Sequence, residues 1–237
     1  MKKTLMICLL TLLVVYASSM IIAKNQMEST SMVDAIHWLG HDTFKIVKDI
    51  VIYIDPYKIK NKDNADVILI THEHFDHCSI DDIKKLQTND TVIIAPKDCI
   101  AKLSGNVKAI NPGKSIVVKG ITIEAIPAYN TNKQFHPRSN QWVGYIITID
   151  SMRIYMAGDT DYIPEMKSLK NITIALLPVS GVYVMTADEA AQAALAIKPE
   201  VAIPMHYGSI VGTIADAKKF ESLLKGKVQV VIKKQEN

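Results

Sequence analysis

The sequence predicts an α/β domain in which two β-sheets carry helices on their outer faces. Short runs of β-branched and aromatic residues recur along the chain, separated by glycine or aspartate, which is typical of strands. Stretches with helical spacing of apolar residues follow some of these runs. The order of strands followed by strand–helix units occurs twice. Sheets covered by helices on their outer faces would bury both kinds of pattern.

Length and composition favour a single globular domain. The chain has 237 residues, of which 49% are hydrophobic and 22% are charged, so neither disorder nor a polytopic membrane protein is indicated. Its 27 basic residues barely outnumber its 24 acidic residues, and they are scattered along the chain. This charge pattern indicates a solvated surface, and we expect no nucleic-acid partner.

The N-terminal segment differs from the rest of the chain. Lys2 and Lys3 precede an apolar run over residues 5–17, which is typical of a secretory signal peptide. The apolar character resumes over residues 21–23, so an uncleaved membrane anchor is the alternative. The protein would then be exported to the periplasm or the extracellular space, or anchored in the membrane facing outward. We predict a signal peptide or anchor over residues 1–23, a polar linker over residues 24–32 and the domain over residues 33–237.

The first half of the domain begins with three strand-like runs that predict an antiparallel meander. A short apolar run then ends at Thr71 and His72, and helical spacing follows over residues 80–86. The predicted strands of this half cover residues 35–39, 43–47, 50–54, 67–70 and 91–95.

The second half resembles the first. Thr186 with Glu189 three residues later is a capping box, which predicts the start of an alanine-rich helix over residues 187–197. A second helix is predicted over residues 214–224. The predicted strands of this half cover residues 116–118, 121–126, 143–149, 153–157, 174–177, 201–205 and 228–232.

The chemistry is concentrated in residues 71–77, which read Thr-His-Glu-His-Phe-Asp-His directly after a predicted strand. Imidazole nitrogens and carboxylate oxygens are the ligands that suit zinc and related divalent ions. His72 and His74, two residues apart on an extended turn, can face one ion. Asp76 and His77 then face a second direction, toward a second ion.

At these residues the sequence resembles the metallo-β-lactamase superfamily, whose signature is His-x-His-x-Asp-His. The resemblance implies an αββα sandwich with two mixed sheets flanked by helices. It also implies three later ligands at strand ends, which match His136, Asp159 and His206. By this resemblance the first metal is held by His72, His74 and His136, the second by Asp76, His77 and His206, and Asp159 bridges the two.

The resemblance further implies a hydrolase that uses hydroxide bound by two divalent ions to cleave an ester, a lactone or a phosphoester. Zinc is expected, with manganese or iron as alternatives, and Asp76 is both a ligand and the catalytic acceptor of the water's proton. The substrate would be a small or lipid-like molecule, as in the branch that contains ascorbate-phosphate lactonases and N-acyl-phosphatidylethanolamine phospholipases. The alternatives are a nuclease of the same fold, a di-iron redox protein and a metal-binding protein without catalysis.

Several neighbouring residues have two interpretations. His41 resembles a position of that branch and could orient a ligand or contact substrate, whereas His37 is expected to be structural. Asp55 could accept an imidazole N–H behind the metal loop, or simply form a turn. The roles of three further pairs of residues are undecided from the sequence. Either Tyr129 or Tyr207 could be the acid that protonates the leaving group, and Lys133 and Arg138 could bind an anion or be ordinary solvated charges. Cys78 and Cys99 could form a disulfide or remain free thiols.

Overall fold

A computed structural model describes residues 16, 19–20, 23–24, 26–60 and 63–236. The chain divides into two compact units, residues 1–34 and residues 35–237. In the N-terminal unit, residues 26–34 are helical, so the segment predicted as an irregular linker has regular structure over most of its length. Most of the predicted leader lies outside the described residues. None of the helices described is long and apolar enough to span a bilayer.

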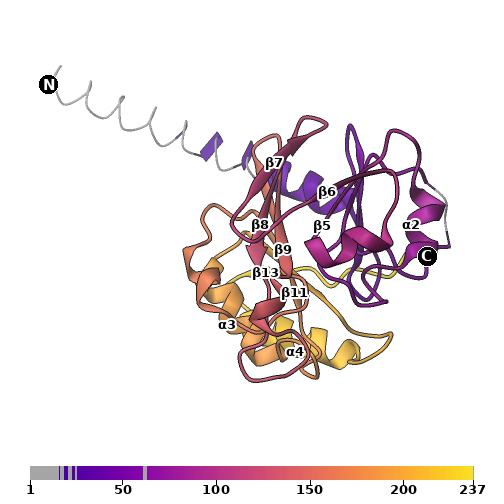
Figure 1. The fold of residues 1–237 in the computed structure, drawn as a ribbon. Helices are drawn as coiled ribbons and strands as arrows, with labels where there is room; N and C mark the ends of the chain where they lie inside the picture. Colours follow the sequence, from indigo (N-terminus) through magenta and orange to yellow (C-terminus); the bar gives the residue numbers. More distant parts are fainter. Residues whose placement is uncertain (1–15, 17–18, 21–22, 25, 61–62, 237) are drawn as a thin grey trace, which may run out of the picture. The chain divides into compact units, whose positions relative to one another are not determined.

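Residues 35–237 form two sheets of matching topology (Figure 1). In the first sheet the strands lie in sequential order from β1 to β6. The pairing is antiparallel from β1 to β3 and parallel from β3 to β6. These strands are β1 (Ile36–Gly40), β2 (Thr43–Val47), β3 (Val51–Ile54), β4 (Val67–Leu69), β5 (Val92–Ala95) and β6 (Asn106–Ala109).

The second sheet repeats this plan, with antiparallel pairing from β7 to β10 and parallel pairing from β10 to β13. Its strands are β7 (Ser115–Val118), β8 (Ile121–Pro127), β9 (Val143–Ile149), β10 (Met152–Met156), β11 (Ile174–Pro178), β12 (Val201–Met205) and β13 (Gln229–Val230). Because β8, β10 and β12 run in the same direction, their carboxyl ends lie at one edge of the sheet.

Helices cover the outer faces of the sheets. The helix α2 (Ile80–Leu86) packs Ile83 and Leu86 against alternate residues of the first sheet, among them Ile68 and Ile93. On the second sheet lie α3 (Ala187–Ile197) and α4 (Ile214–Leu224), side by side in Figure 1. Short 3₁₀ helices occupy Lys97–Lys102, Arg138–Asn140 and Pro164–Ser168. The predicted fold class, two mixed sheets flanked by helices, is confirmed.

The local signals explain most of the element boundaries. The Thr186 hydroxyl accepts a hydrogen bond from the Glu189 backbone N–H, and the Glu189 carboxylate accepts one from the Thr186 N–H, so the predicted capping box is confirmed. The strand β6 was not predicted, because it lies at the sheet edge and its residues are partly exposed, which leaves no continuous apolar run. The predicted strand over residues 228–232 shrinks to Gln229–Val230.

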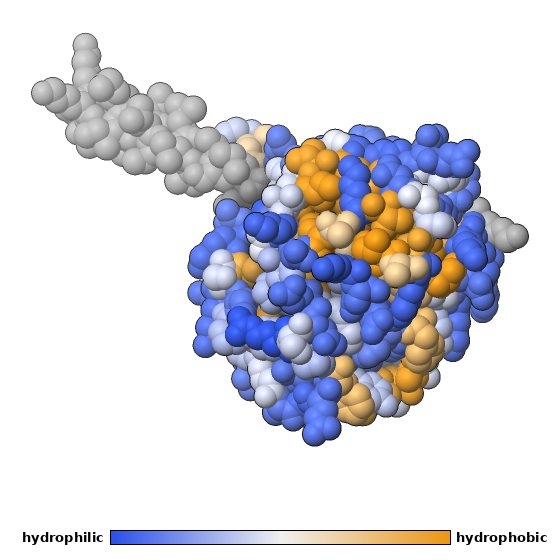
Figure 2. All heavy atoms as spheres, in the orientation of Figure 1, coloured by the Kyte–Doolittle hydropathy of each residue, from blue (hydrophilic) through white to orange (hydrophobic). Residues whose placement is uncertain are grey.

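Exposed hydrophobic side chains gather on one part of the surface near the edge strands β6 and β7 (Figure 2). Figure 2 shows hydrophobic side chains gathered in the upper part of the visible face, where Figure 1 places these strands. Val117 in β7 is 69% exposed. Most of the remaining visible surface is hydrophilic.

Two contacts between distant segments matter for the site. The Tyr145 hydroxyl in β9 donates to the Ile70 carbonyl at 2.6 Å and so ties the second sheet to the end of β4. The C-terminal tail returns to the first strand, where Gln235 forms a parallel bridge with Trp38 and the Glu236 N–H donates to the Trp38 carbonyl at 2.8 Å.

Candidate metal centre

All seven predicted ligands follow the carboxyl ends of strands. Four come from the single loop after β4, namely His72, His74, Asp76 and His77. The other three come one each from the segments after β8, β10 and β12, and they are His136, Asp159 and His206. The strand order therefore gathers all of them at one edge of the two sheets.

The first group consists of His72, His74 and His136. One ring nitrogen of each lies within 4.8 Å of the others, and the Nε2 of His72 is 3.0 Å from the Nδ1 of His74. His72 and His136 are buried, and His74 is partly buried. These are the residues that the sequence assigned to the first metal.

The second group consists of Asp42, His77, Asp159 and His206, all buried and again with one donor atom each within 4.8 Å. The Nε2 of His77 is 3.6 Å from Asp159 Oδ1, and the Nε2 of His206 is 3.2 Å from Asp159 Oδ2. His77 and His206 were predicted for the second metal. Asp42 was not predicted.

Asp159 lies between the two groups. Its Oδ2 is 3.2 Å from the Nε2 of His136 in the first group and 3.2 Å from the Nε2 of His206 in the second. The backbone helps to place it, because the preceding Gly158 has a φ of +66°, and an added Cβ would lie 3.0 Å from the Val143 carbonyl. Asp159 is therefore within reach of both groups.

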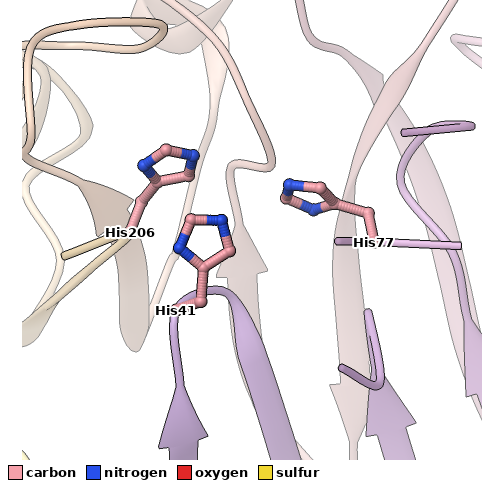
Figure 3. Close-up of side chains that lie close together, drawn as sticks. All are labelled: His41, His77 and His206. Carbon is pink, nitrogen blue, oxygen red and sulfur yellow. The ribbon is translucent and has the colours of Figure 1, made fainter. Parts of the chain in front are cut away.

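Asp76 lies beside the second group. Its Oδ2 is 3.0 Å from the Nε2 of His41 and 3.6 Å from the Nε2 of His77. Figure 3 shows His41, His77 and His206 each turning one ring nitrogen toward the space between them. The structure therefore brings His41 into the centre, where it contacts a predicted ligand.

The imidazoles of His77, His136 and His206 are each fixed by a partner on Nδ1. The Nδ1 of His77 lies 2.8 Å from Asp55, so of the two roles considered for this carboxylate the structure shows the acceptor of an imidazole N–H. The Nδ1 of His136 lies 3.0 Å from the Asn130 side-chain oxygen, and that of His206 lies 2.9 Å from Ser180 Oγ. Such partners fix the tautomer and the orientation of metal-binding histidines. They leave Nε2 facing the centre.

The same logic applies to His72. The Thr71 hydroxyl donates to Asp55 Oδ2 at 2.6 Å, so its oxygen is left to accept the N–H of His72 Nδ1 at 3.0 Å. The Nε2 of His72 is then a bare lone pair. His74 is the exception, since its Nδ1 is the nitrogen that faces His72.

The donors fit divalent cations. The Nε2 atoms of His77 and His136, Asp159 Oδ1 and both oxygens of Asp42 are buried, and within the described residues none has a hydrogen-bond partner. Buried polar atoms without a partner are rare because leaving them unsatisfied costs about 1–3 kcal/mol each. A cation bound here would satisfy them, and nitrogen and carboxylate donors suit zinc, iron and manganese.

The two groups differ in electrostatics. Burial lowers the pKa of His72 well below its ordinary value, and the nearby His77 lowers it further. Burial also disfavours charge on His206, but the carboxylates of Asp159 and Asp42 raise its pKa to about 9. Burial raises the pKa of Asp42 well above its ordinary value, against the opposing effect of His206. A cation entering the second group therefore displaces protons.

Backbone strain marks the same residues. Both His41 (φ +53°) and His206 (φ +59°) adopt the left-handed conformation, which non-glycine residues rarely do. The His206 N–H donates to the His41 carbonyl at 3.1 Å, so the two strained residues support each other. Outliers of this kind cluster at functional sites.

A cleft of about 270 Å³ opens onto the centre. Its polar floor is formed by predicted ligands, namely His74, Asp76, His136, Asp159 and His206. Its walls are apolar and come from Phe75, Phe135, Tyr183 and Ile210. Phe75 is 68% exposed and Phe135 is 50% exposed, although both are large aromatic side chains.

The remaining candidates lie elsewhere. Lys133 forms an ion pair with Asp161, and Arg138 pairs with Glu165 at 3.0 Å, so both cations already have acidic partners. The hydroxyl of Tyr129 donates to Glu165 at 2.9 Å, and burial raises the pKa of Tyr207 to about 12. His37 pairs with Glu236 at 2.8 Å, and Cys78 and Cys99 are buried free thiols in one apolar cluster.

Comparison with known proteins agrees with this centre. Residues 35–206 match the model of the beta-lactamase superfamily domain. A UPF0173 metal-dependent hydrolase of Thermococcus onnurineus is 33% identical over 219 residues, which cover 84% of this chain and 96% of the relative. A crystal structure of a metal-dependent hydrolase from Parabacteroides distasonis is 37% identical with a TM-score of 0.77, and the match covers 85% of this chain and 93% of that chain.

A more distant structure shows the fold alone. Igni18, a metallo hydrolase from Ignicoccus hospitalis, has a TM-score of 0.71 at 24% identity, and the match covers 85% of this chain and 95% of that chain. The ligand groups, the fold and the similarity to the UPF0173 proteins lead to one conclusion. The chain belongs to the beta-lactamase superfamily and is a metal-dependent hydrolase with the metallo-β-lactamase fold.

Proposed function

We propose that this hydrolase cleaves a small ester or lactone whose acyl part is apolar, with two divalent metal ions in the ligand groups described above. The observation that carries the proposal is the cleft, because its floor holds the ligands while Phe75, Phe135 and Ile210 form apolar walls. Substrate sites combine apolar walls with a few convergent polar groups in this way. A cleft of about 270 Å³ suits a small molecule or one end of a lipid-like molecule.

His72, His74 and His136 would hold the first ion, and His77 and His206 would hold the second with Asp76 beside them. Zinc is the proposed metal, because imidazole donors predominate. Such ions would supply Lewis-acid chemistry, which activates water and polarises a substrate oxygen.

Asp76 is the proposed proton acceptor of the reaction. Its carboxylate lines the cleft and receives a hydrogen bond from His41 at 3.0 Å, which fixes its direction. The contact with His41 also lowers the pKa of Asp76, although burial opposes this effect. His41 is therefore a positioning residue for Asp76.

The charges around the cleft favour a carbonyl substrate over a phosphoester. Of the described residues that line it, none is a lysine or an arginine. Lys133 and Arg138, which could have bound a phosphate, are paired with Asp161 and Glu165. An anionic substrate would therefore lack the direct cationic partner that usually recognises a phosphate group.

A substrate panel tests this proposal. The purified, zinc-loaded chain would be assayed with p-nitrophenyl acetate, butyrate and octanoate, with γ-lactones, with bis(p-nitrophenyl) phosphate and with structured RNA. We expect turnover of the esters or lactones that rises with acyl length until the cleft is filled. Turnover of the phosphodiester or RNA without any ester or lactone turnover would contradict the proposal and favour the nuclease alternative.

The apolar walls have their own test. Phe75→Ala and Phe135→Ala should each raise KM for the butyrate ester about tenfold, as expected for roughly 1.4 kcal/mol of lost binding, with kcat little changed. Val117→Ala is the matched control, because Val117 is equally exposed but lies on β7 outside the cleft. Unchanged KM in both wall variants would remove the walls from substrate binding.

We also propose that the protein is exported. The support is the lysine-led apolar segment at residues 2–17. A fusion of alkaline phosphatase to residues 1–32 should be active outside the cytoplasm, whereas a fusion that starts from residues 24–32 should be silent. Equal activity of the two fusions would contradict export through this segment.

A further inference from the structure

Asp42 is a buried carboxylate that the function described so far does not use. Its side chain is fully buried, and within the described residues neither oxygen has a hydrogen-bond partner. It directly follows Gly40 and His41, which make the strained turn between β1 and β2. Burying a carboxyl group that has no hydrogen-bond partner is expensive, and such a group can keep its charge only beside a cation.

Asp55 shows what a structural carboxylate looks like in the same protein. It is also fully buried, but it accepts hydrogen bonds from the Thr71 N–H at 2.8 Å, from the Thr71 hydroxyl at 2.6 Å and from His77 Nδ1 at 2.8 Å. Asp42 has no such donors. Its Oδ2 lies 3.9 Å from His77 Nδ1, which is too far for a hydrogen bond.

The neighbours of Asp42 are metal-ligand types. One of its oxygens lies within 4.8 Å of donor atoms of His77, Asp159 and His206. Two carboxylates in one buried group repel each other unless a cation lies between them.

We propose that Asp42 is an additional ligand of the second metal ion. The second position would then have the carboxylates of Asp42 and Asp159, with Asp76 beside them, and the imidazoles of His77 and His206. The first would have three imidazoles and Asp159. Carboxylate oxygens favour manganese and similar hard ions more than imidazoles do, so the second position would discriminate against zinc relative to the first. This inference rests on the two-metal site of the proposed function but not on its substrate.

The test compares Asp42→Asn with the wild-type full chain. Both are stripped with a chelator, reloaded with Mn²⁺ or Zn²⁺ alone, and analysed for metal content and affinity by elemental analysis and Mn²⁺ electron paramagnetic resonance. We expect the wild type to bind two Mn²⁺ and the variant to bind the second Mn²⁺ roughly 10–100-fold more weakly, with a smaller change for Zn²⁺. Two Mn²⁺ bound by Asp42→Asn with wild-type affinity would overturn the proposal.

The stability of the stripped protein separates a ligand from a structural residue. Replacing a buried carboxyl group that has no partner by a neutral amide should leave the Tm of stripped Asp42→Asn equal to that of the wild type or above it, while the rise in Tm on adding Mn²⁺ becomes smaller. A lower Tm of the stripped variant with an unchanged rise on Mn²⁺ would show a structural role and contradict the proposal. Asp42→Ser gives the same comparison with a smaller side chain, and Asp150→Asn, at an exposed turn, is the neutral control.

These outcomes are independent of the substrate assay. If the ester and lactone panel shows no turnover but Asp42→Asn still loses the second Mn²⁺, the proposed substrate is wrong and the assignment of Asp42 stands. If turnover is found but the variant binds two Mn²⁺ normally, the assignment of Asp42 is wrong and the proposed substrate stands.

Discussion

The two sheets contribute to the metal centre in different ways. The first sheet supplies four predicted ligands from one loop of six residues, from His72 to His77. The second supplies three, each from a different strand end, and they are His136, Asp159 and His206. A single loop keeps its donors together by local geometry, whereas the separate ligands converge only when the strands of the second sheet are in register. The centre therefore depends on the local geometry of one loop in the first sheet and on the tertiary arrangement of several strands in the second.

The largest expected effect concerns Asp159, where the two sides meet. Asp159→Ala should abolish hydrolysis and release at least one metal, because this carboxylate is within 3.2 Å of ligands in both groups. The loss of activity should exceed the 10–100-fold that is typical of removing an outer partner of a ligand. Elemental analysis and a steady-state assay check it. Full activity with two metals would remove Asp159 from the centre.

Next come single imidazoles from each side. His74→Ala should lose the metal of the first group and keep the second, while His206→Ala should do the opposite. Metal content should fall from about two to about one equivalent in each case, and adding both substitutions should remove both ions. If either single variant retained two tightly bound ions, the division of the ligands into two groups would be wrong.

Smaller effects are expected for the partners behind the imidazoles. Asp55→Asn removes a charged acceptor of both His77 and Thr71, so we expect metal affinity to fall roughly 10–100-fold. Ser180→Ala removes only the neutral hydroxyl near His206, and its effect should be at the lower end of that range. Competition with a chelator measures both. A larger loss in Ser180→Ala than in Asp55→Asn would contradict the stated roles.

The smallest effect tests the link between the sheets. Tyr145→Phe removes a hydroxyl that donates to the carbonyl of Ile70 at 2.6 Å, just before the metal loop. We expect the free energy of unfolding to fall by about 1–3 kcal/mol, since the buried carbonyl loses its donor, while two metals stay bound. Denaturant unfolding and elemental analysis check it. Loss of metal in this variant would show that the loop is not held by local geometry alone.

The contrast between the sheets also explains what the sequence could predict. The loop from His72 to His77 is a contiguous pattern, so its residue types alone indicate a metal site. His136 and His206 are isolated histidines, and only the resemblance to a known family singled them out. The fold followed from alternating apolar runs and one capping box, but β6 was missed because its partly exposed residues carry no such run.

Asp42 was not predicted as a ligand because its burial depends on contacts between segments that are far apart in the sequence. In the sequence it is one aspartate between a histidine and a threonine, and such residues usually form turns at the surface. Its complete burial arises because the turn between β1 and β2 lies against the end of β12, where the His206 N–H donates to the His41 carbonyl. No local pattern reports a contact between residues so far apart in the chain.

The return of the C-terminal tail to β1 has a consequence for handling the protein. The bridge between Gln235 and Trp38, with the Glu236 N–H donating to the Trp38 carbonyl, covers the open side of a strand that would otherwise present unpaired backbone groups. Uncovered strand edges promote pairing between molecules. The tail also lies against the glycine of the β1–β2 turn, because a Cβ at Gly40 would come within 2.6 Å of the Gln235 side chain. An affinity tag fused directly after residue 237 would therefore lie next to the segment that covers this strand edge. A spacer before the tag would allow residues 235 and 236 to keep their contacts with Trp38.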